Sequence, residues 1–99
     1  MIRVILPFHL RTLAKLPAGE LKLEVPAPVT QQALIDVIEA QFPVLKGTIR
    51  DHGAVKRRPM IRFYACNEDL SHEAPDAPLP EKVVNGQEPF YVIAAIAGG

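Results

Sequence analysis

The sequence predicts an α+β domain in which a mixed sheet of four to five strands carries one main helix on one face. Three patterns predict this class. Two segments near the start alternate with period two, which is typical of half-buried strands. A later segment repeats apolar residues at helical spacing, and the last segment is an unbroken apolar run typical of a buried strand.

The first two strands are expected to form an antiparallel hairpin. Ile2, Val4 and Leu6 recur at every second position, and this period with β-branched side chains indicates a strand. Residues 21–25 alternate between an aliphatic and a charged side chain and predict the second strand. Residues 16–19 contain Pro and Gly, which supply the backbone angles of the turn between the two strands.

One amphipathic helix is predicted after the hairpin. Thr30 stands at the position of an N-cap, immediately before a run with helical spacing. Leu34, Ile38 and Phe42 recur every four residues and form the apolar face of about three turns. Pro43 is expected to end the helix because proline lacks an amide hydrogen and clashes with the preceding turn.

The second half of the chain supplies the remaining strands. We expect an irregular connection over 46–59, a strand over 61–66, a turn at 67–69, a loop over 71–82 and a turn at 85–88. Residues 90–96 predict a strand buried on both faces, at the sheet centre beside the first strand. This order predicts a β-grasp fold over residues 1–99 as one domain, with a flexible tail at 97–99.

Composition excludes several classes of function. Lys and Arg number 11, as do Asp and Glu, so the formal net charge is zero. A nucleic-acid-binding protein normally carries net positive charge, so no nucleic-acid partner is expected. No stretch approaches the roughly 20 apolar residues that span a bilayer, so we expect a cytoplasmic protein without a membrane partner. The single Cys66 excludes a disulfide scaffold and an iron–sulfur cluster.

No pattern predicts an active site of the chain's own. His9, His52 and His72 are far apart and lack zinc-motif spacing, so no metal site is expected. Cys66 is interpreted as a small buried hydrophobic residue rather than a nucleophile. The basic cluster 56–58 is interpreted as a solvated loop, and the acidic C-terminal third suits steering towards a protein partner.

The chain ends on Gly98 and Gly99, directly after the last apolar strand. Because glycine has no side chain, a diglycine tail is thin and flexible enough to enter a narrow channel of another protein. Its α-carboxylate, with an ordinary pKa of about 3.5, is ionised at neutral pH and is able to attack the α-phosphate of ATP. The resulting acyl-adenylate is an activated carbonyl that accepts sulfur or an amine.

These features resemble the MoaD/ThiS ubiquitin-like sulfur-carrier family. Residues 92–99 match the family's apolar strand and its closing aliphatic–Ala–Gly–Gly, and residues 63–69 match its strand and following Asn–x–Glu/Asp turn. Gln87 stands where the family usually has an acid, and Ala94 and Ala95 stand where prolines are common. The length and extended middle loop resemble the cysteine-synthesis carriers (CysO-like) more than the short thiamine carriers.

The resemblance implies a protein substrate or carrier rather than an enzyme, or the small subunit of a synthase. A ubiquitin-activating-enzyme-like adenylyltransferase would use ATP to adenylate Gly99, and a sulfur donor would convert the product to a thiocarboxylate. The sulfur would pass to a precursor on a sulfur-accepting synthase of molybdopterin, cysteine or thiamine biosynthesis. The carrier itself would bind no cofactor.

The resemblance also assigns roles to residues around Gly99. Gly98 would meet the steric requirement of the reactive end, and Ile96 and Ala97 would guide the tail into the partner. Phe63 and Phe90 are candidates for an exposed partner-binding patch, with core packing as the alternative for both.

Two other functions fit the same sequence. The activated tail is equally suited to transfer to a lysine, which would make the chain a ubiquitin-like protein modifier. A non-catalytic β-grasp interaction module, with an incidental diglycine, is the third interpretation, because this fold is reused for many functions.

Overall fold

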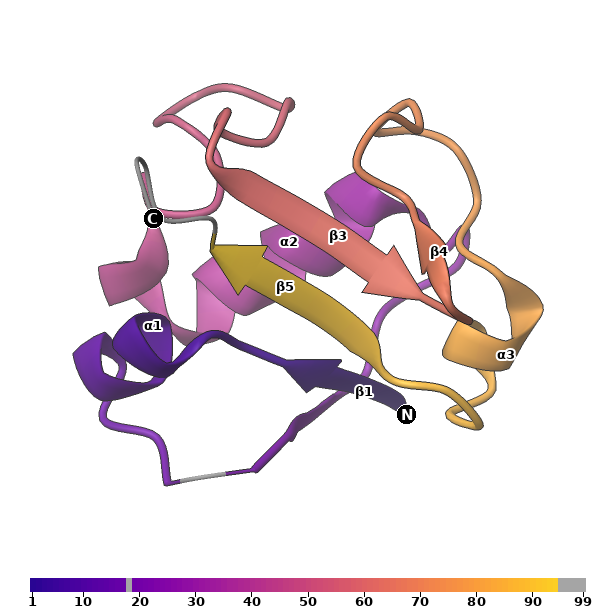
Figure 1. The fold of residues 1–99 in the computed structure, drawn as a ribbon, viewed down its shortest axis with the longest axis horizontal. Coiled ribbons are helices and arrows are strands. Elements are labelled where there is room, and N and C mark those ends of the chain that lie inside the picture. The colour runs from indigo at the N-terminus through magenta and orange to yellow at the C-terminus, as the bar shows by residue number, and fades with distance from the viewer. Residues whose placement is uncertain (18, 95–99) are drawn as a thin grey trace.

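The computed structural model describes residues 1–17 and 19–94, and in this part of the chain five strands form one mixed sheet in the order β2-β1-β5-β3-β4. The strands are β1 (Ile2–Ile5), β2 (Leu21–Leu23), β3 (Ile61–Ala65), β4 (Glu68–Asp69) and β5 (Phe90–Ala94). The helices are α1 (Phe8–Leu13), α2 (Gln31–Gln41), the 3₁₀ turn η1 (Pro43–Leu45) and α3 (Glu81–Val84). Figure 1 shows α2 crossing behind the sheet. The predicted α+β class is confirmed.

The strand pairing places β5 at the centre of the sheet. β1 pairs with β2 in antiparallel register, as predicted for the hairpin. β5 runs parallel to β1, with Ile5 opposite Tyr91, and antiparallel to β3, with Ile61 opposite Ala94. The expectation that the last strand lies beside the first is therefore confirmed.

Helix α2 begins and ends where the sequence predicts. The Thr30 side chain accepts a hydrogen bond from the backbone N–H of Ala33 at 3.0 Å, which satisfies one of the free amides of the first turn. The helix ends at Gln41, and Pro43 begins the 3₁₀ turn that follows. Leu34 and Ile38 are fully buried, so the predicted apolar face is the one that meets the sheet.

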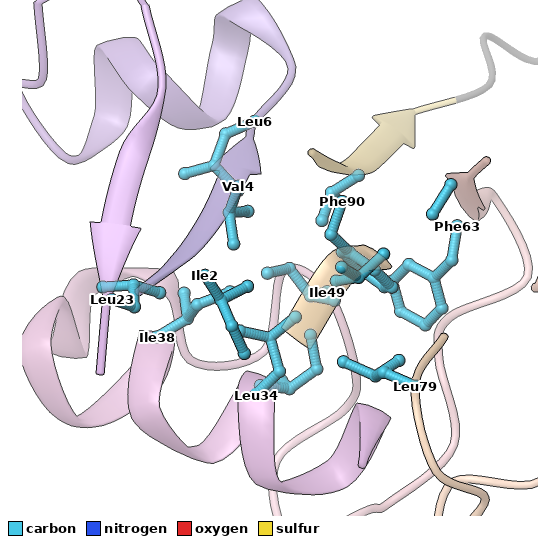
Figure 2. Packing of buried hydrophobic residues seen from close by; sticks show 14 of the residues in the cluster. Ile2, Val4, Leu6, Leu23, Leu34, Ile38, Ile49, Phe63, Leu79 and Phe90 are labelled. Atoms are coloured by element: carbon cyan, nitrogen blue, oxygen red, sulfur yellow. The ribbon is translucent and has the colours of Figure 1, made fainter. Parts of the chain in front are cut away.

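The core lies between α2 and one face of the sheet (Figure 2). Alternate residues of β1, β3 and β5 are buried, which is the pattern of a sheet covered on a single face. The loop residues Ile49 and Leu79 close the same cluster from outside the regular elements. The aliphatic and aromatic side chains of this core include Ile2, Val4, Leu6, Leu23, Leu34, Ile38, Ile49, Phe63, Leu79 and Phe90.

Three short elements differ from the sequence prediction. Helix α1 was not predicted, since six residues carry too little helical periodicity; its Leu10 is buried in the core. Helix α3 occupies the end of the expected 71–82 loop and the residues after it, and its four residues are anchored by buried Val83. Strand β4 falls in the expected turn at 67–69, because Cys66 and Asn67 make the reversal with positive φ.

Candidate functional site

The sheet face turned away from α2, here called the outer face, is the candidate partner surface. On β5, Phe90 and Val92 point into the core, whereas Tyr91 and Ile93 are 39% and 41% exposed. The predicted burial of this strand on both faces is wrong, because one main helix covers one face only. Residues that pair across neighbouring strands point to the same face of the sheet. Ile5 pairs with Tyr91, so the outer face continues onto β1, and the partners of β5 on its other side lie on β3.

The neighbours on β3 give the outer face a mixed chemical character. Tyr64 lies opposite Tyr91, and Arg62 lies opposite Ile93. Both β3 side chains are partly exposed. The outer face therefore offers aromatic and aliphatic area with a cation at one side, a combination that is enriched at protein–protein interfaces.

Arg3 on β1 anchors the turn that precedes β5. Its guanidinium donates to Glu20 at 3.0 and 3.1 Å, and to the backbone oxygens of Gly86 and Gln87 at 3.1 Å each. The hydrogen bond with Glu20 raises the pKa of Arg3, so the guanidinium stays charged. Arg3 thereby ties β1 to the turn that precedes the central strand.

The expected aromatic patch of Phe63 and Phe90 is not on the surface. Phe63 is 2% exposed and Phe90 is 0% exposed, and the two ring centroids lie 5.3 Å apart in the core (Figure 2). Both rings stand on the inward positions of their strands, so their proposed partner contact is corrected to core packing. The exposed residues of β5, Tyr91 and Ile93, were missed. Because a single helix covers only one face of a sheet, alternate residues of the last strand could have been predicted to be exposed.

The expected tail residues Ile96, Ala97, Gly98 and Gly99 lie outside the described residues. The structure does place their point of attachment. Ala94 ends β5 opposite Ile61, the first residue of β3. Met60, which is 42% exposed, immediately precedes Ile61. The tail is therefore attached at the end of the sheet where the 46–60 connection leads into β3.

The histidines and Cys66 do not assemble a metal centre in the described ranges. Across residues 1–17 and 19–94, no group of three or more His, Cys, Asp or Glu side chains comes together in a way that would hold a metal ion. Cys66 is half-buried in the turn after β3. In the same part of the chain, no helix has the length and apolar character needed to cross a membrane.

Two solved structures share this fold. The crystal structure of SAMP1 from Haloferax volcanii matches with a TM-score of 0.73 and 14% identity, over 98% of this chain and 97% of that one. The crystal structure of the Amycolatopsis orientalis BexX/CysO complex matches with a TM-score of 0.72 and 21% identity, over the full length of both chains. No family model matches the sequence, and no curated protein matches it. The likeness confirms the predicted β-grasp fold.

Proposed function

We propose that this chain is a ubiquitin-like sulfur carrier whose reactive group is the C-terminal carboxylate of Gly99. One observation carries the proposal: the Ala–Gly–Gly sequence begins three residues after Ala94, which ends the central strand of a β-grasp sheet whose outer face carries exposed residues. A partner that binds the outer face would therefore also receive the tail. The chain acts as a protein substrate in this proposal, and its partners supply the catalysis.

The length of the tail sets the geometry of delivery. The residues after Ala94 number five, 95 to 99. A fully extended chain of that length reaches at most about 17 Å. A partner bound to Tyr91 and Ile93 would thus need its active site within that distance of the end of β5. The absence of side chains on Gly98 and Gly99 suits a narrow channel over the last part of this path.

The proposed chemistry begins at the Gly99 carboxylate. One carboxylate oxygen attacks the α-phosphorus of ATP on an adenylyltransferase of the ubiquitin-activating class, and pyrophosphate leaves. A sulfur nucleophile, delivered as sulfide or as an enzyme persulfide, then attacks the acyl carbon, and AMP leaves with the former carboxylate oxygen. Where a persulfide delivers the sulfur, a thiol reduces the mixed acyl disulfide and releases the thiocarboxylate. Transfer of that sulfur to a precursor on a synthase regenerates the carboxylate with oxygen from water.

The comparisons support the proposal at the level of fold and assembly. The CysO chain, which bears the name of the cysteine-synthesis carriers that this sequence resembles, matches over its full length. That CysO was crystallised as a complex with BexX, so a protein of this fold does engage a protein partner. We infer a corresponding partner for this chain, bound through its outer face.

Intact-mass spectrometry tests the proposal. The full chain would be incubated with ATP, an activating enzyme from its own organism and a sulfide source. We expect a mass gain equal to the replacement of one oxygen by one sulfur. The matched control is the chain lacking Gly98 and Gly99, which retains every described residue and should show no gain.

The same experiment separates the alternative functions. An isopeptide link between Gly99 and a lysine of another protein, without thiocarboxylate, would assign the chain to protein modification instead. An unchanged mass for both the full chain and the truncated chain would favour the interaction module.

A further inference from the structure

A hollow of about 490 Å³ lies between the 46–60 connection and the loop after β4. Both segments run along the upper edge of Figure 1. Lys56 and Arg57 line the hollow from one side, and His72 and Glu73 line it from the other. Its size falls in the range of small-molecule sites, roughly 300–1,000 Å³.

Arg57 is held rigidly at this hollow by neutral acceptors. Its Nε donates to the backbone oxygen of Ser71 at 2.8 Å, and its Nη1 donates to the backbone oxygens of Ile61 at 3.1 Å and Arg58 at 3.3 Å. The predicted solvated role is therefore wrong for this residue, which is half-buried. Because these acceptors are carbonyl groups, they orient the guanidinium without cancelling its charge.

No carboxylate neutralises Arg57 within the described residues, and this distinguishes it from neighbouring arginines. Arg50 is 8% exposed and pairs with both Asp36 and Glu39. Arg58 pairs with Asp51. The hollow beside Arg50, about 390 Å³, is lined by those two carboxylates and is therefore unsuited to an anion. The guanidinium of Arg57 thus keeps its charge beside the hollow, and the N–H groups of its Nη2 make none of the three hydrogen bonds to carbonyl oxygens.

The other polar groups around the hollow point to the same ligand chemistry. Lys56 and His72 are exposed and add cationic or donor groups, against the single lining carboxylate of Glu73. The first amides of α2 are already occupied, since Gln32 donates to the backbone oxygen of Pro75 and Ala33 donates to Thr30. The side chains of the hollow therefore supply the free donors.

We propose that this hollow binds a small phosphate-bearing molecule, with Arg57 as the fixed phosphate ligand and Lys56 and His72 as its flanking donors. The Nη2 group of Arg57 is a charged donor able to form charge-assisted hydrogen bonds to phosphate oxygens, and Lys56 supplies a second cation for a phosphate dianion. The volume exceeds that of bare phosphate, so an organic phosphomonoester is the ligand class that fills the hollow. This proposal does not rest on the sulfur-carrier function.

Amide chemical shifts of the full ¹⁵N-labelled chain test the site. Inorganic phosphate and glycerol 3-phosphate would be titrated separately at constant ionic strength, with sodium chloride as the reference salt. We expect saturable shifts confined to residues 56–58 and 71–74, with tighter binding of the phosphomonoester. Equal affinity for the two probes would overturn the organic-ligand assignment. Shifts that fail to saturate would overturn the site itself.

Charge variants on exposed side chains give the decisive comparison. Lys56→Gln and His72→Gln should each weaken phosphomonoester binding about two- to fivefold, the range of a surface ion pair. Glu73→Gln should strengthen it by a similar factor. Lys82→Gln removes the same charge from α3, outside the hollow, and should change the affinity little. An equal effect of Lys56→Gln and Lys82→Gln would show general charge attraction and overturn the proposal.

Arg57→Lys completes the set, because it keeps the charge and loses the guanidinium that the backbone carbonyls orient. We expect weaker phosphomonoester binding than in the wild-type chain. Thermal unfolding of each variant separates loss of the site from loss of the fold, since Arg57 also holds three backbone carbonyls. A folded Arg57→Lys variant with unchanged affinity would contradict the role given to the guanidinium.

Discussion

Ile61 lies directly opposite Ala94, so the first residue of β3 marks the level at which the central strand ends. The same Ile61 accepts a hydrogen bond through its backbone oxygen from Arg57. The attachment point of the diglycine tail and the arginine of the proposed phosphate site are therefore linked through one residue. The surface proposed for a protein partner and the hollow proposed for a small anion are thus connected at this end of the sheet.

The outer face should matter for partner activation and little for folding. Ile93→Asp places a charge in the exposed apolar area beside the end of β5, and we expect the rate of thiocarboxylate formation to fall at least about tenfold, as for a central interface residue. Val44→Asp is the matched control, because Val44 is an aliphatic residue at least as exposed as Ile93 but lies on η1. Equal rates for the two variants would move the partner surface away from β5.

Neighbouring residues of β5 should differ sharply in their contribution to stability. Phe90→Ala removes a fully buried ring that packs on Phe63, and we expect a loss of about 3–5 kcal/mol in the free energy of unfolding. Tyr91→Ala removes a ring from the exposed side of the same strand, and we expect a loss below about 1 kcal/mol. Urea denaturation measures both. Similar losses would contradict the assignment of the two faces.

The two carboxylates of Arg50 should contribute unequally. Glu39 receives two hydrogen bonds from the guanidinium, both at 3.1 Å, and its side chain is 13% exposed, whereas the side chain of Asp36 is 58% exposed. We expect Glu39→Gln to lower the free energy of unfolding by about 1–3 kcal/mol. Asp36→Asn should cost less than about 1 kcal/mol because water screens the exposed pair. The reverse order in chemical denaturation would be inconsistent with this geometry.

Asp69 should make the stability of the folded protein depend on pH in the acid range. Hydrogen bonds from Ser71, through its hydroxyl and its backbone N–H, lower the pKa of the Asp69 carboxyl. Since the folded-state pKa is the lower one, ionised Asp69 stabilises the fold above the ordinary Asp pKa of about 3.9. This contribution is lost as the pH falls through the lowered value.

Thermal unfolding between about pH 5 and pH 2 measures this acid dependence. Asp69→Asn should flatten it, because the amide does not titrate. Asp76→Asn is the control, since Asp76 is exposed and accepts no side-chain hydrogen bond within the described residues. Identical pH profiles for the wild type and Asp69→Asn would refute the proposed role of the carboxylate.

Local patterns in the sequence were sufficient for the main elements of the fold. Thr30 and Pro43 bracket α2 because an N-cap oxygen and a missing amide act within one turn of the chain. The alternation of Ile2 and Val4 predicts β1 because successive side chains of a strand point to opposite faces. Helices α1 and α3 were beyond such patterns, since elements of four to six residues are held by the tertiary contacts of Leu10 and Val83.

The β-grasp class, the central position of β5 and the diglycine that follows this strand in the chain could all be predicted from sequence patterns. The exposure of individual residues in this strand depends on the tertiary structure, because Phe90 and Tyr91 are neighbouring aromatic residues and their burial depends on which sheet face α2 covers. The tertiary structure also separated Arg57 from Arg50 and Arg58. The partners of a side chain come from segments distant in sequence, and here they leave one arginine oriented by carbonyls and the other two paired with carboxylates.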